Sequence, residues 1–270
     1  MAVPGFPQFH GFHKRKKNCY YYYSTFILTA TVTPVRTRKN EEEFAIVNAM
    51  KGVFITGTDT NVGKTVVSAA VFHRYRATMP LCYWKPIQTG IETDDDTATV
   101  RALGECCDSE IFDRGVRLSR PVSPHLAARL AGTTIRLDAV AGLISASSGK
   151  VNWIVEGAGG VLAPINDSQL MIDLIEMLRL PALVVARSSL GTINHTLLSL
   201  EALRRRSLPI AGVVMVGEPN SENRDAIERY GDVRVIAETP MLDGLTHSSL
   251  AFWARDEFDK NGLLMEHLGG

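Results

Sequence analysis

From residue 50 onward, short apolar runs alternate with longer stretches in which apolar residues recur at helical spacing. The apolar runs predict strands at 52–56, 81–84, 152–155, 182–186, 210–216 and 233–237. The helical spacing predicts helices at 65–76, 97–104, 124–130, 137–147, 169–178, 192–206 and 220–230. The run 182–186 is apolar on both faces, which is typical of parallel strands covered by helices on each side. The pattern therefore predicts one doubly wound α/β domain with a mostly parallel sheet flanked by helices.

Composition narrows the class of protein. The 270 residues include 29 Lys plus Arg and 29 Asp plus Glu, a balance that argues against a polybasic nucleic-acid binder. No apolar run reaches the roughly 18 residues that a membrane-spanning helix needs, so we expect no membrane partner. Four Cys with no Cys-x-x-Cys pair indicate neither a disulfide framework nor a structural zinc site. We expect a reduced, cytoplasmic protein.

The first 49 residues differ from the rest. They carry seven basic residues against three acidic ones and nine of the twenty aromatic residues, with no sustained helical or strand period. Three interpretations stay open: a disordered extension, an organelle-targeting peptide, or a start assigned too far upstream of Met50. We expect residues 1–49 to be an extension and residues 50–270 to form the functional domain.

The segment Gly57-Thr-Asp-Thr-Asn-Val-Gly-Lys-Thr65 lies between a predicted strand and a predicted helix. A bound phosphate needs inward-facing backbone N–H groups, a helix N-terminus and a cation. Gly63 would let the backbone approach the phosphates, Lys64 would reach the β and γ phosphates, and Thr65 would bind Mg²⁺. Thr58 occupies the usual first-glycine position, but the setting still predicts a phosphate-binding loop (P-loop).

Two further charged residues lie at predicted strand ends. Glu156 follows the strand 152–155 and opens the predicted glycine-rich loop 157–160, at the sheet edge where open α/β sheets bind ligands. It is therefore the second candidate for the metal site. Lys85 follows the strand 81–84 and precedes Pro86, so a loop presents its ammonium. For such a lysine taken alone, exposure at the surface is the more common outcome. One Asp of the triplet 94–96 fits an N-cap.

Together these segments resemble the dethiobiotin synthetase family. The matching motifs occur in the family's order across about residues 50–245: Gly57-Thr-Asp-Thr-x-Val-Gly-Lys-Thr65, Lys85-Pro-x-x-Thr-Gly90, Asp96-Thr-x-x-Val100, Ser123-Pro-His-Leu-Ala-Ala128, Val155-Glu-Gly-Ala-Gly-Gly160 and Gly191-Thr-Ile-Asn-His195. The ordered set is far more specific than a lone P-loop.

The resemblance implies a P-loop NTPase-type synthetase domain that closes a ureido ring. Its substrates would be 7,8-diaminononanoate, CO2 and ATP with Mg²⁺, and its products dethiobiotin, ADP and phosphate. Lys85 would be catalytic, beside the carbamate and the γ-phosphate. Thr65, Asp96 and Glu156 would hold the metal, with Asp96 chosen from the triplet by its spacing to Val100.

The resemblance also implies binding residues. The nucleotide would contact Thr60, Asn61, Val62, Gly63, Lys64, Thr65, Val66, Asp96, Glu156, Gly157, Ala158, Gly159, Gly217, Glu218, Pro240, Met241 and Leu242. The diamine would contact Thr89, Gly160 and Asn194, the last from the partner subunit of a homodimer whose active site lies near the interface. His125 and His195 fall inside family motifs, and we expect structural roles for both.

Two departures and one rival interpretation remain. Asn61 stands where many family members carry Glu, and Gly217-Glu218-Pro219 stands where an Asn is common beside the base, so the contacts to adenine stay open. The rival is a P-loop ATPase of the partition or assembly type. Such ATPases add a lysine early in the loop, and residues 57–62 contain none. A guanine-reading Asn-Lys-x-Asp pattern is also absent from the sequence.

Overall fold

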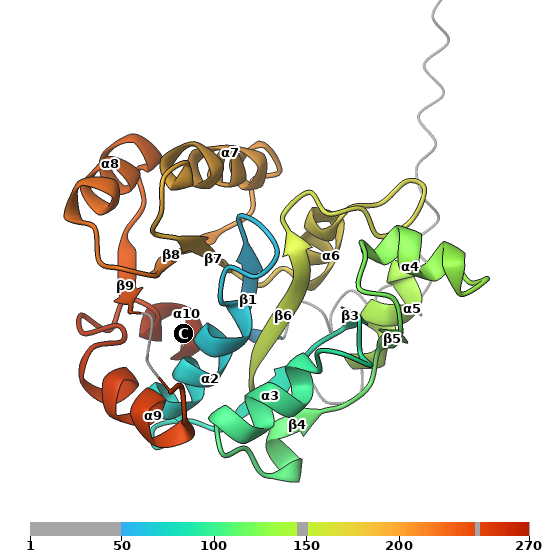
Figure 1. The fold of residues 1–270 in the computed structure, drawn as a ribbon, viewed down its shortest axis with the longest axis horizontal. Helices are drawn as coiled ribbons and strands as arrows, with labels where there is room; N and C mark the ends of the chain where they lie inside the picture. Colours follow the sequence, from blue (N-terminus) through green and yellow to red (C-terminus); the bar gives the residue numbers. More distant parts are fainter. Residues whose placement is uncertain (1–49, 145–150, 241–243, 270) are drawn as a thin grey trace, which may run out of the picture. The chain divides into compact units, whose positions relative to one another are not determined.

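A computed structural model describes residues 50–144, 151–240 and 244–269, all of which belong to one compact unit. The main sheet has the strand order β4-β2-β6-β1-β7-β8-β9, and every neighbouring pair is parallel (Figure 1). Its strands are β1 (Lys51–Gly57), β2 (Leu81–Trp84), β4 (Ile111–Phe112), β6 (Asn152–Gly160), β7 (Ala182–Arg187), β8 (Ile210–Val216) and β9 (Val235–Thr239). The expected mostly parallel, doubly wound sheet is confirmed.

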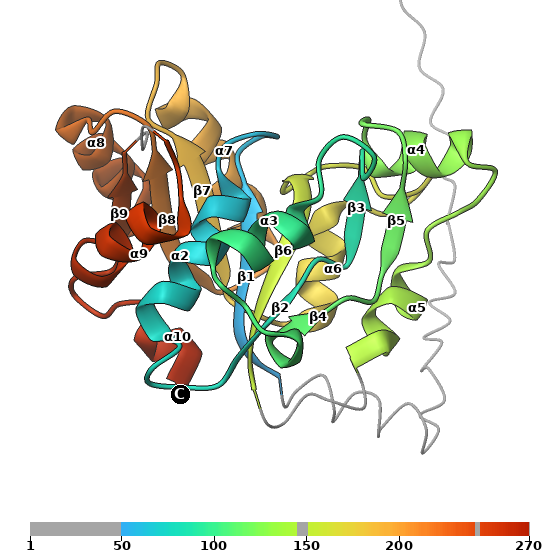
Figure 2. The ribbon, with the colours of Figure 1, turned by 60° about the horizontal axis from the view of Figure 1, so that its bottom comes forward.

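Helices cover both faces of this sheet, and a small second sheet lies beside it (Figure 2). The helices are α2 (Lys64–Tyr75), α3 (Asp96–Leu103), α4 (Pro124–Leu130), α5 (Leu137–Ala141), α6 (Met171–Leu178), α7 (Thr192–Arg205), α8 (Ser221–Gly231), α9 (His247–Asp256) and α10 (Met265–Gly269). The second sheet pairs β3 (Ile87–Thr89) with β5 (Val116–Leu118) in parallel. In the part of the chain that the structure describes, no helix is long and apolar enough to cross a bilayer.

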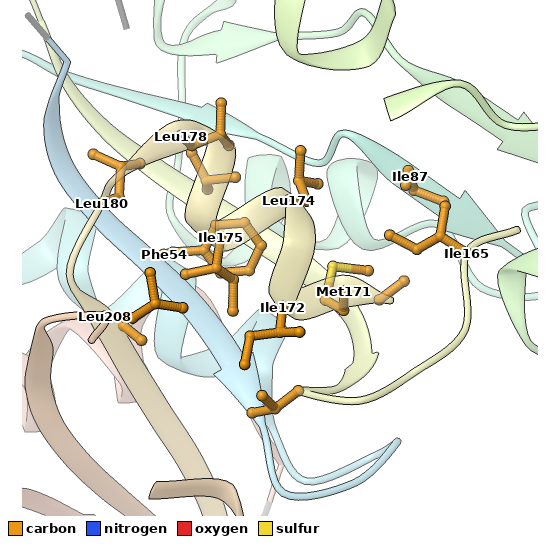
Figure 3. Close-up of a cluster of buried hydrophobic side chains, with 14 of the residues drawn as sticks. Phe54, Ile87, Ile165, Met171, Ile172, Leu174, Ile175, Leu178, Leu180 and Leu208 are labelled. Carbon is orange, nitrogen blue, oxygen red and sulfur yellow. The ribbon is translucent and has the colours of Figure 1, made fainter. Parts of the chain in front are cut away.

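Successive side chains of the central strand enter two different cores. Val53 and Ile55 pack with α2, α9 and the C-terminal Leu268, a cluster that we call the α2 core. Phe54, between them, packs with Leu174 and other residues of α6 in the α6 core (Figure 3). All three side chains are fully buried. A strand buried on both faces must be apolar throughout, which is why the unbroken apolar runs predicted these strands.

Most predicted elements lie within two residues of their observed bounds. The helix predicted at 137–147 is shorter: α5 ends at Ala141 and continues as a 3₁₀ turn, Gly142–Ile144, while 145–147 lie outside the described residues. The strand predicted at 233–237 is displaced to Val235–Thr239, following Asp232 in the left-handed region (φ 42°). The sequence pattern missed β3, β4, β5, α9 and α10.

The prediction of a glycine-rich loop at 157–160 was wrong, because these residues are the last part of β6. Glycines occupy this segment because neighbouring atoms leave little room for a side chain. A Cβ on Gly157 would lie 2.9 Å from the ring of Phe54, and one on Gly160 would lie 3.2 Å from the carbonyl oxygen of Gly57. Gly159 has φ 70°, in the left-handed region that favours glycine. Residues 157–160 are therefore a closely packed, fixed segment at the carboxyl end of β6.

Candidate active site

The P-loop connects the carboxyl end of β1 to the first turn of α2. Gly63 is the residue before the helix and has φ 98°, so a side chain there would be strained. Thr58 N–H donates to Val185 O of β7 (2.9 Å), which ties the loop to the sheet. Lys64 is 7% exposed, and its Nζ donates to Asp59 O at 3.0 Å. Burial and the neighbouring Lys85 lower the pKa of Lys64 to about 8.

Glu156 is the centre of a buried polar cluster. It is completely buried in the middle of β6, and each carboxylate oxygen has two partners. Oε1 accepts from Thr65 Oγ1 (3.1 Å) and from Lys85 Nζ (2.8 Å). Oε2 accepts from Ser68 Oγ (2.8 Å) and from Tyr83 Oη (3.0 Å). A buried carboxylate with this many donors is held in one orientation.

Lys85 joins this cluster to Asp96. Its side chain is 3% exposed, so the alternative of an exposed surface lysine is wrong. Its Nζ lies 2.6 Å from Asp96 Oδ2 and also donates to Gly157 O at 3.1 Å. Burial by itself would lower the pKa of Lys85, but the carboxylates of Glu156 and Asp96 outweigh it, and the pKa lies above its ordinary value. Lys85 is a fixed cation.

Asp96 is the member of the acidic triplet that reaches the P-loop. Its Oδ1 accepts from Thr65 Oγ1 at 2.9 Å, whereas Asp95 caps α3 by accepting from Ala98 N–H at 3.0 Å. Burial would raise the pKa of Asp96, but Lys85 and Thr65 outweigh it and hold the pKa below its usual value. The oxygens of Thr65, Asp96 and Glu156 thus converge, and such a set of hard oxygen donors fits Mg²⁺.

Three cavities adjoin this cluster. The P-loop cavity, of about 350 Å³, is lined by Lys64, Thr65, Lys85, Asp96 and Glu156. The side cavity, of about 720 Å³, lies between the P-loop and the ends of β7, β8 and β9. The large cavity, of about 950 Å³, lies between the P-loop, the end of β6, the start of α4 and α7. Asn61 (φ 56°) lines all three. The arrangement suits a nucleotide across the P-loop and a second ligand in the large cavity.

Comparisons with known proteins identify the family of this chain. A family described as "AAA domain" matches residues 51–249. An ATP-dependent dethiobiotin synthetase BioD from Paramagnetospirillum magneticum is 50% identical over 202 residues, 75% of this chain and 94% of that protein. Its counterpart from Brucella ovis is 44% identical over 198 residues, 73% of this chain and 90% of that protein. The chain belongs to the ATP-dependent dethiobiotin synthetase family. A solved ParA family ATPase from Chlorobium tepidum TLS covers 81% of this chain and 97% of its own at 12% identity, with a TM-score of 0.47.

The structure distributes the residues predicted from the dethiobiotin synthetase resemblance over the three cavities. Thr60, Gly63, Val66, Ala158 and Gly159 line the P-loop cavity, and Val62, Gly217, Glu218 and Pro240 line the side cavity. Thr89 and Gly160 line the large cavity. Gly157 contributes its carbonyl oxygen to Lys85. Met241 and Leu242 lie outside the described residues.

Asn194 is the predicted substrate residue that this subunit does not bring to the site. It is exposed on the first turn of α7 and is not among the residues lining the large cavity, although its neighbour His195 is. His195 is also exposed, so the structural role expected for it gains no support from burial. His125 Nδ1 lies 3.1 Å from Ser123 Oγ, a local contact at the start of α4.

The sequence analysis missed several residues that dethiobiotin synthetase chemistry would involve. Ser68 and Tyr83 hold Glu156, and Arg117 donates to Lys85 O at 2.8 Å. Arg187 pairs with Asp59 of the P-loop at 2.8 Å. Asp94 lines both the P-loop cavity and the large cavity. Of these, Ser68, Tyr83 and Asp94 lie within three residues of a motif, and the carboxyl group of Asp94 was the most direct signal.

Proposed function

We propose that this chain catalyses the ATP-dependent closure of 7,8-diaminononanoate and CO2 to dethiobiotin, with release of ADP and phosphate. The observation that supports this most directly is the cluster in which buried Lys85 and Glu156 contact the partly buried Asp96 and Thr65. It lines a P-loop cavity that shares part of its wall with a larger cavity. Family membership and the sharing of that wall support the choice of a synthetase over an ATPase that acts as a switch.

The chemistry consists of three steps. One amine nitrogen attacks CO2 to give a carbamate, and a carbamate oxygen attacks the γ-phosphorus as ADP leaves. The second amine nitrogen then attacks the carbamoyl carbon, and phosphate leaves as the ring closes. Each step brings anionic oxygens together, so positioning and charge stabilisation are the main tasks of the protein.

The residues of the P-loop cavity would divide these tasks. Lys64 would contact the β and γ phosphates from the first turn of α2. Lys85 would offset the charge shared by the carbamate and the transferred phosphoryl group, and its fixed position would avoid reorganisation during the reaction. Thr65, Asp96 and Glu156 would hold Mg²⁺, which when bound supplies charge neutralisation between the phosphates. Thr89 and Gly160 would border the diamine.

An assay with purified protein, ATP, Mg²⁺, bicarbonate and 7,8-diaminononanoate tests this function. The expected result is ADP release that requires the diamine, with a product of the mass of dethiobiotin. Removing Mg²⁺ with a chelator should stop both ADP release and formation of this product. ADP release that is independent of the diamine, with no such product, would indicate an ATPase of the partition or assembly type instead.

We also propose a homodimer that covers the large cavity. Leu162 and Leu198 line this cavity and are 57% and 56% exposed, and Leu190 nearby in the chain is fully exposed. Exposed leucines in the lining of a polar site, with a further one close in sequence, are what a second subunit would bury. Leu198→Glu should shift the sedimentation coefficient toward the monomer value. Phe252→Glu, at an exposed residue of α9 (77%), is the matched control and should not. A monomeric wild-type protein would contradict the proposal.

A further inference from the structure

The large cavity and the P-loop cavity meet at a shared wall. Six residues line both: Thr60, Asn61, Thr89, Asp94, Ala158 and Gly159. The proposed reaction joins both amines of the diamine to a carbon next to the γ-phosphate. The reacting end of the diamine must therefore lie at this junction, while the rest of its chain lies in the large cavity.

Asp94 is the one residue of these six with an ionisable side chain. Its backbone is held on both sides, because its N–H donates to Gly90 O (2.9 Å) and its carbonyl oxygen accepts from Gln88 Nε2 (2.8 Å). Within the described ranges 50–144, 151–240 and 244–269, its carboxylate has no hydrogen-bond or ion-pair partner, and the residue is exposed. The backbone of Asp94 is therefore held in place, and its carboxylate is available to bind a ligand.

The two neighbouring carboxylates are already engaged. Asp95 caps α3, and Asp96 is bonded to Thr65 and Lys85. The nearby cations Lys64 and Lys85 would repel an ammonium group, and Lys85 compensates the charge of Glu156. An aliphatic amine is protonated near neutral pH. Of the six residues at the junction, Asp94 is the one whose charge can attract this ammonium group.

We propose, on the basis of the function proposed above, that Asp94 binds an amino group of the diamine at the junction of the two cavities. The carboxylate would orient the amine that is not carboxylated and would select a substrate with two vicinal amines over one with a single amine. This role concerns binding and orientation, and the bond changes remain with the groups assigned above.

Asp94→Asn tests the proposal, with Asp95→Asn as its matched control. Asn caps a helix about as well as Asp, so the control removes one negative charge one residue away and keeps α3 intact. Asp94→Asn keeps an acceptor oxygen but removes the negative charge, so a charge-assisted hydrogen bond becomes a weaker neutral one. We therefore expect the KM for the diamine to rise about tenfold, with the KM for ATP and the melting temperature unchanged. Asp95→Asn should leave all three unchanged.

Calorimetric titration of the diamine into the ATP-free protein gives a second readout that does not depend on turnover. Asp94→Asn should raise its Kd about tenfold, and Asp94→Glu should recover part of the loss. An analogue that lacks the amine that is not carboxylated should bind the wild type and Asp94→Asn equally. An unchanged Kd and KM, or an equal loss in Asp95→Asn, would overturn the proposal. A wild-type protein that binds the diamine through Asp94 without turning it over would refute the proposed function and leave this inference standing.

Discussion

Lys85, the buried lysine of the P-loop cavity, contacts both carboxylates and a backbone carbonyl oxygen. Lys85 lies between two carboxylates, and its ammonium also reaches a backbone carbonyl oxygen at the end of β6. Burying a charge is costly unless it is paired and hydrogen-bonded, and this lysine has three acceptors. The residue therefore stabilises the fold locally and presents a cation to the P-loop cavity.

Lys85→Ala should reduce ring closure by at least about 100-fold, the usual effect of losing one charge-stabilising donor. ATP binding, measured by calorimetry, should persist because Lys64 and the P-loop backbone are unchanged. Without the Lys85 ammonium, the buried carboxylate of Glu156 loses the cation paired with it. The free energy of unfolding should therefore fall by about 3 to 5 kcal/mol. Turnover equal to the wild type would contradict the role assigned to Lys85.

At the scale of elements, the small β3–β5 sheet fixes the backbone around this lysine. Arg117 of β5 donates to Lys85 O (2.8 Å), and Val116 N–H donates to Pro86 O (2.9 Å). Because Pro86 has no N–H, the chain at this point cannot rely on regular strand pairing alone. The second sheet supplies the missing support.

Arg117→Ala should lower kcat about tenfold with little change in the KM for ATP, because the Lys85 carbonyl loses a charged donor while the P-loop stays intact. Asp113→Asn is the control. Asp113 is the exposed ion-pair partner of Arg117 (2.9 Å), and its loss leaves the bond to Lys85 in place. Steady-state kinetics of both variants provide the check, and equal effects would contradict a specific role for the contact with Lys85.

The contact between α2 and α3 should make stability depend on pH. His73 of α2 lies with Nε2 2.6 Å from Leu103 O, and burial lowers the pKa of His73 below its ordinary value of 6.5. As pH falls, the unfolded chain binds this proton first, so the free energy of unfolding should decrease from pH 6.5 downward. Denaturant unfolding should show a weaker pH dependence in His73→Gln, and an identical dependence in both proteins would contradict this.

The sequence predicted helices and strands better than it predicted the contacts between side chains. Long buried strands such as β7 and β8 leave an unbroken apolar run, whereas β3, β4 and β5 are two or three residues long and leave no period. The proximity of Glu156 to the P-loop was predictable, although the residue lies in the middle of β6 and not at a strand end. Its partners Ser68 and Tyr83 were not, because they are 88 and 73 residues distant in sequence and meet it only through the packing of β2 and α2 on β6.

At the scale of the whole molecule, every motif residue lies after residue 50, and Met50 itself is buried in the α6 core. The equal numbers of basic and acidic residues in the full sequence average a basic first segment and a slightly acidic remainder. The first 49 residues carry none of the motifs on which the proposed site rests.

A chain that starts at Met50 should therefore fold and keep its turnover. A chain that starts at Gly57 is the control. It lacks most of β1, the strand between β6 and β7, and should fail to fold. Circular dichroism and the dethiobiotin assay measure both outcomes. Loss of turnover in the chain starting at Met50 would show that the first segment belongs to the functional unit.

The position of β1 in the sheet also constrains when activity first appears. β1 pairs with β6 from Asn152 and with β7 from Ala182, so its two neighbours are synthesised about 100 or more residues after it. Non-local parallel pairing is slow, because long loops must close before any contact is gained. On the ribosome, the P-loop emerges early but has no Glu156 opposite it until β6 follows. Nucleotide binding should thus appear late in synthesis, as one of the last events of folding.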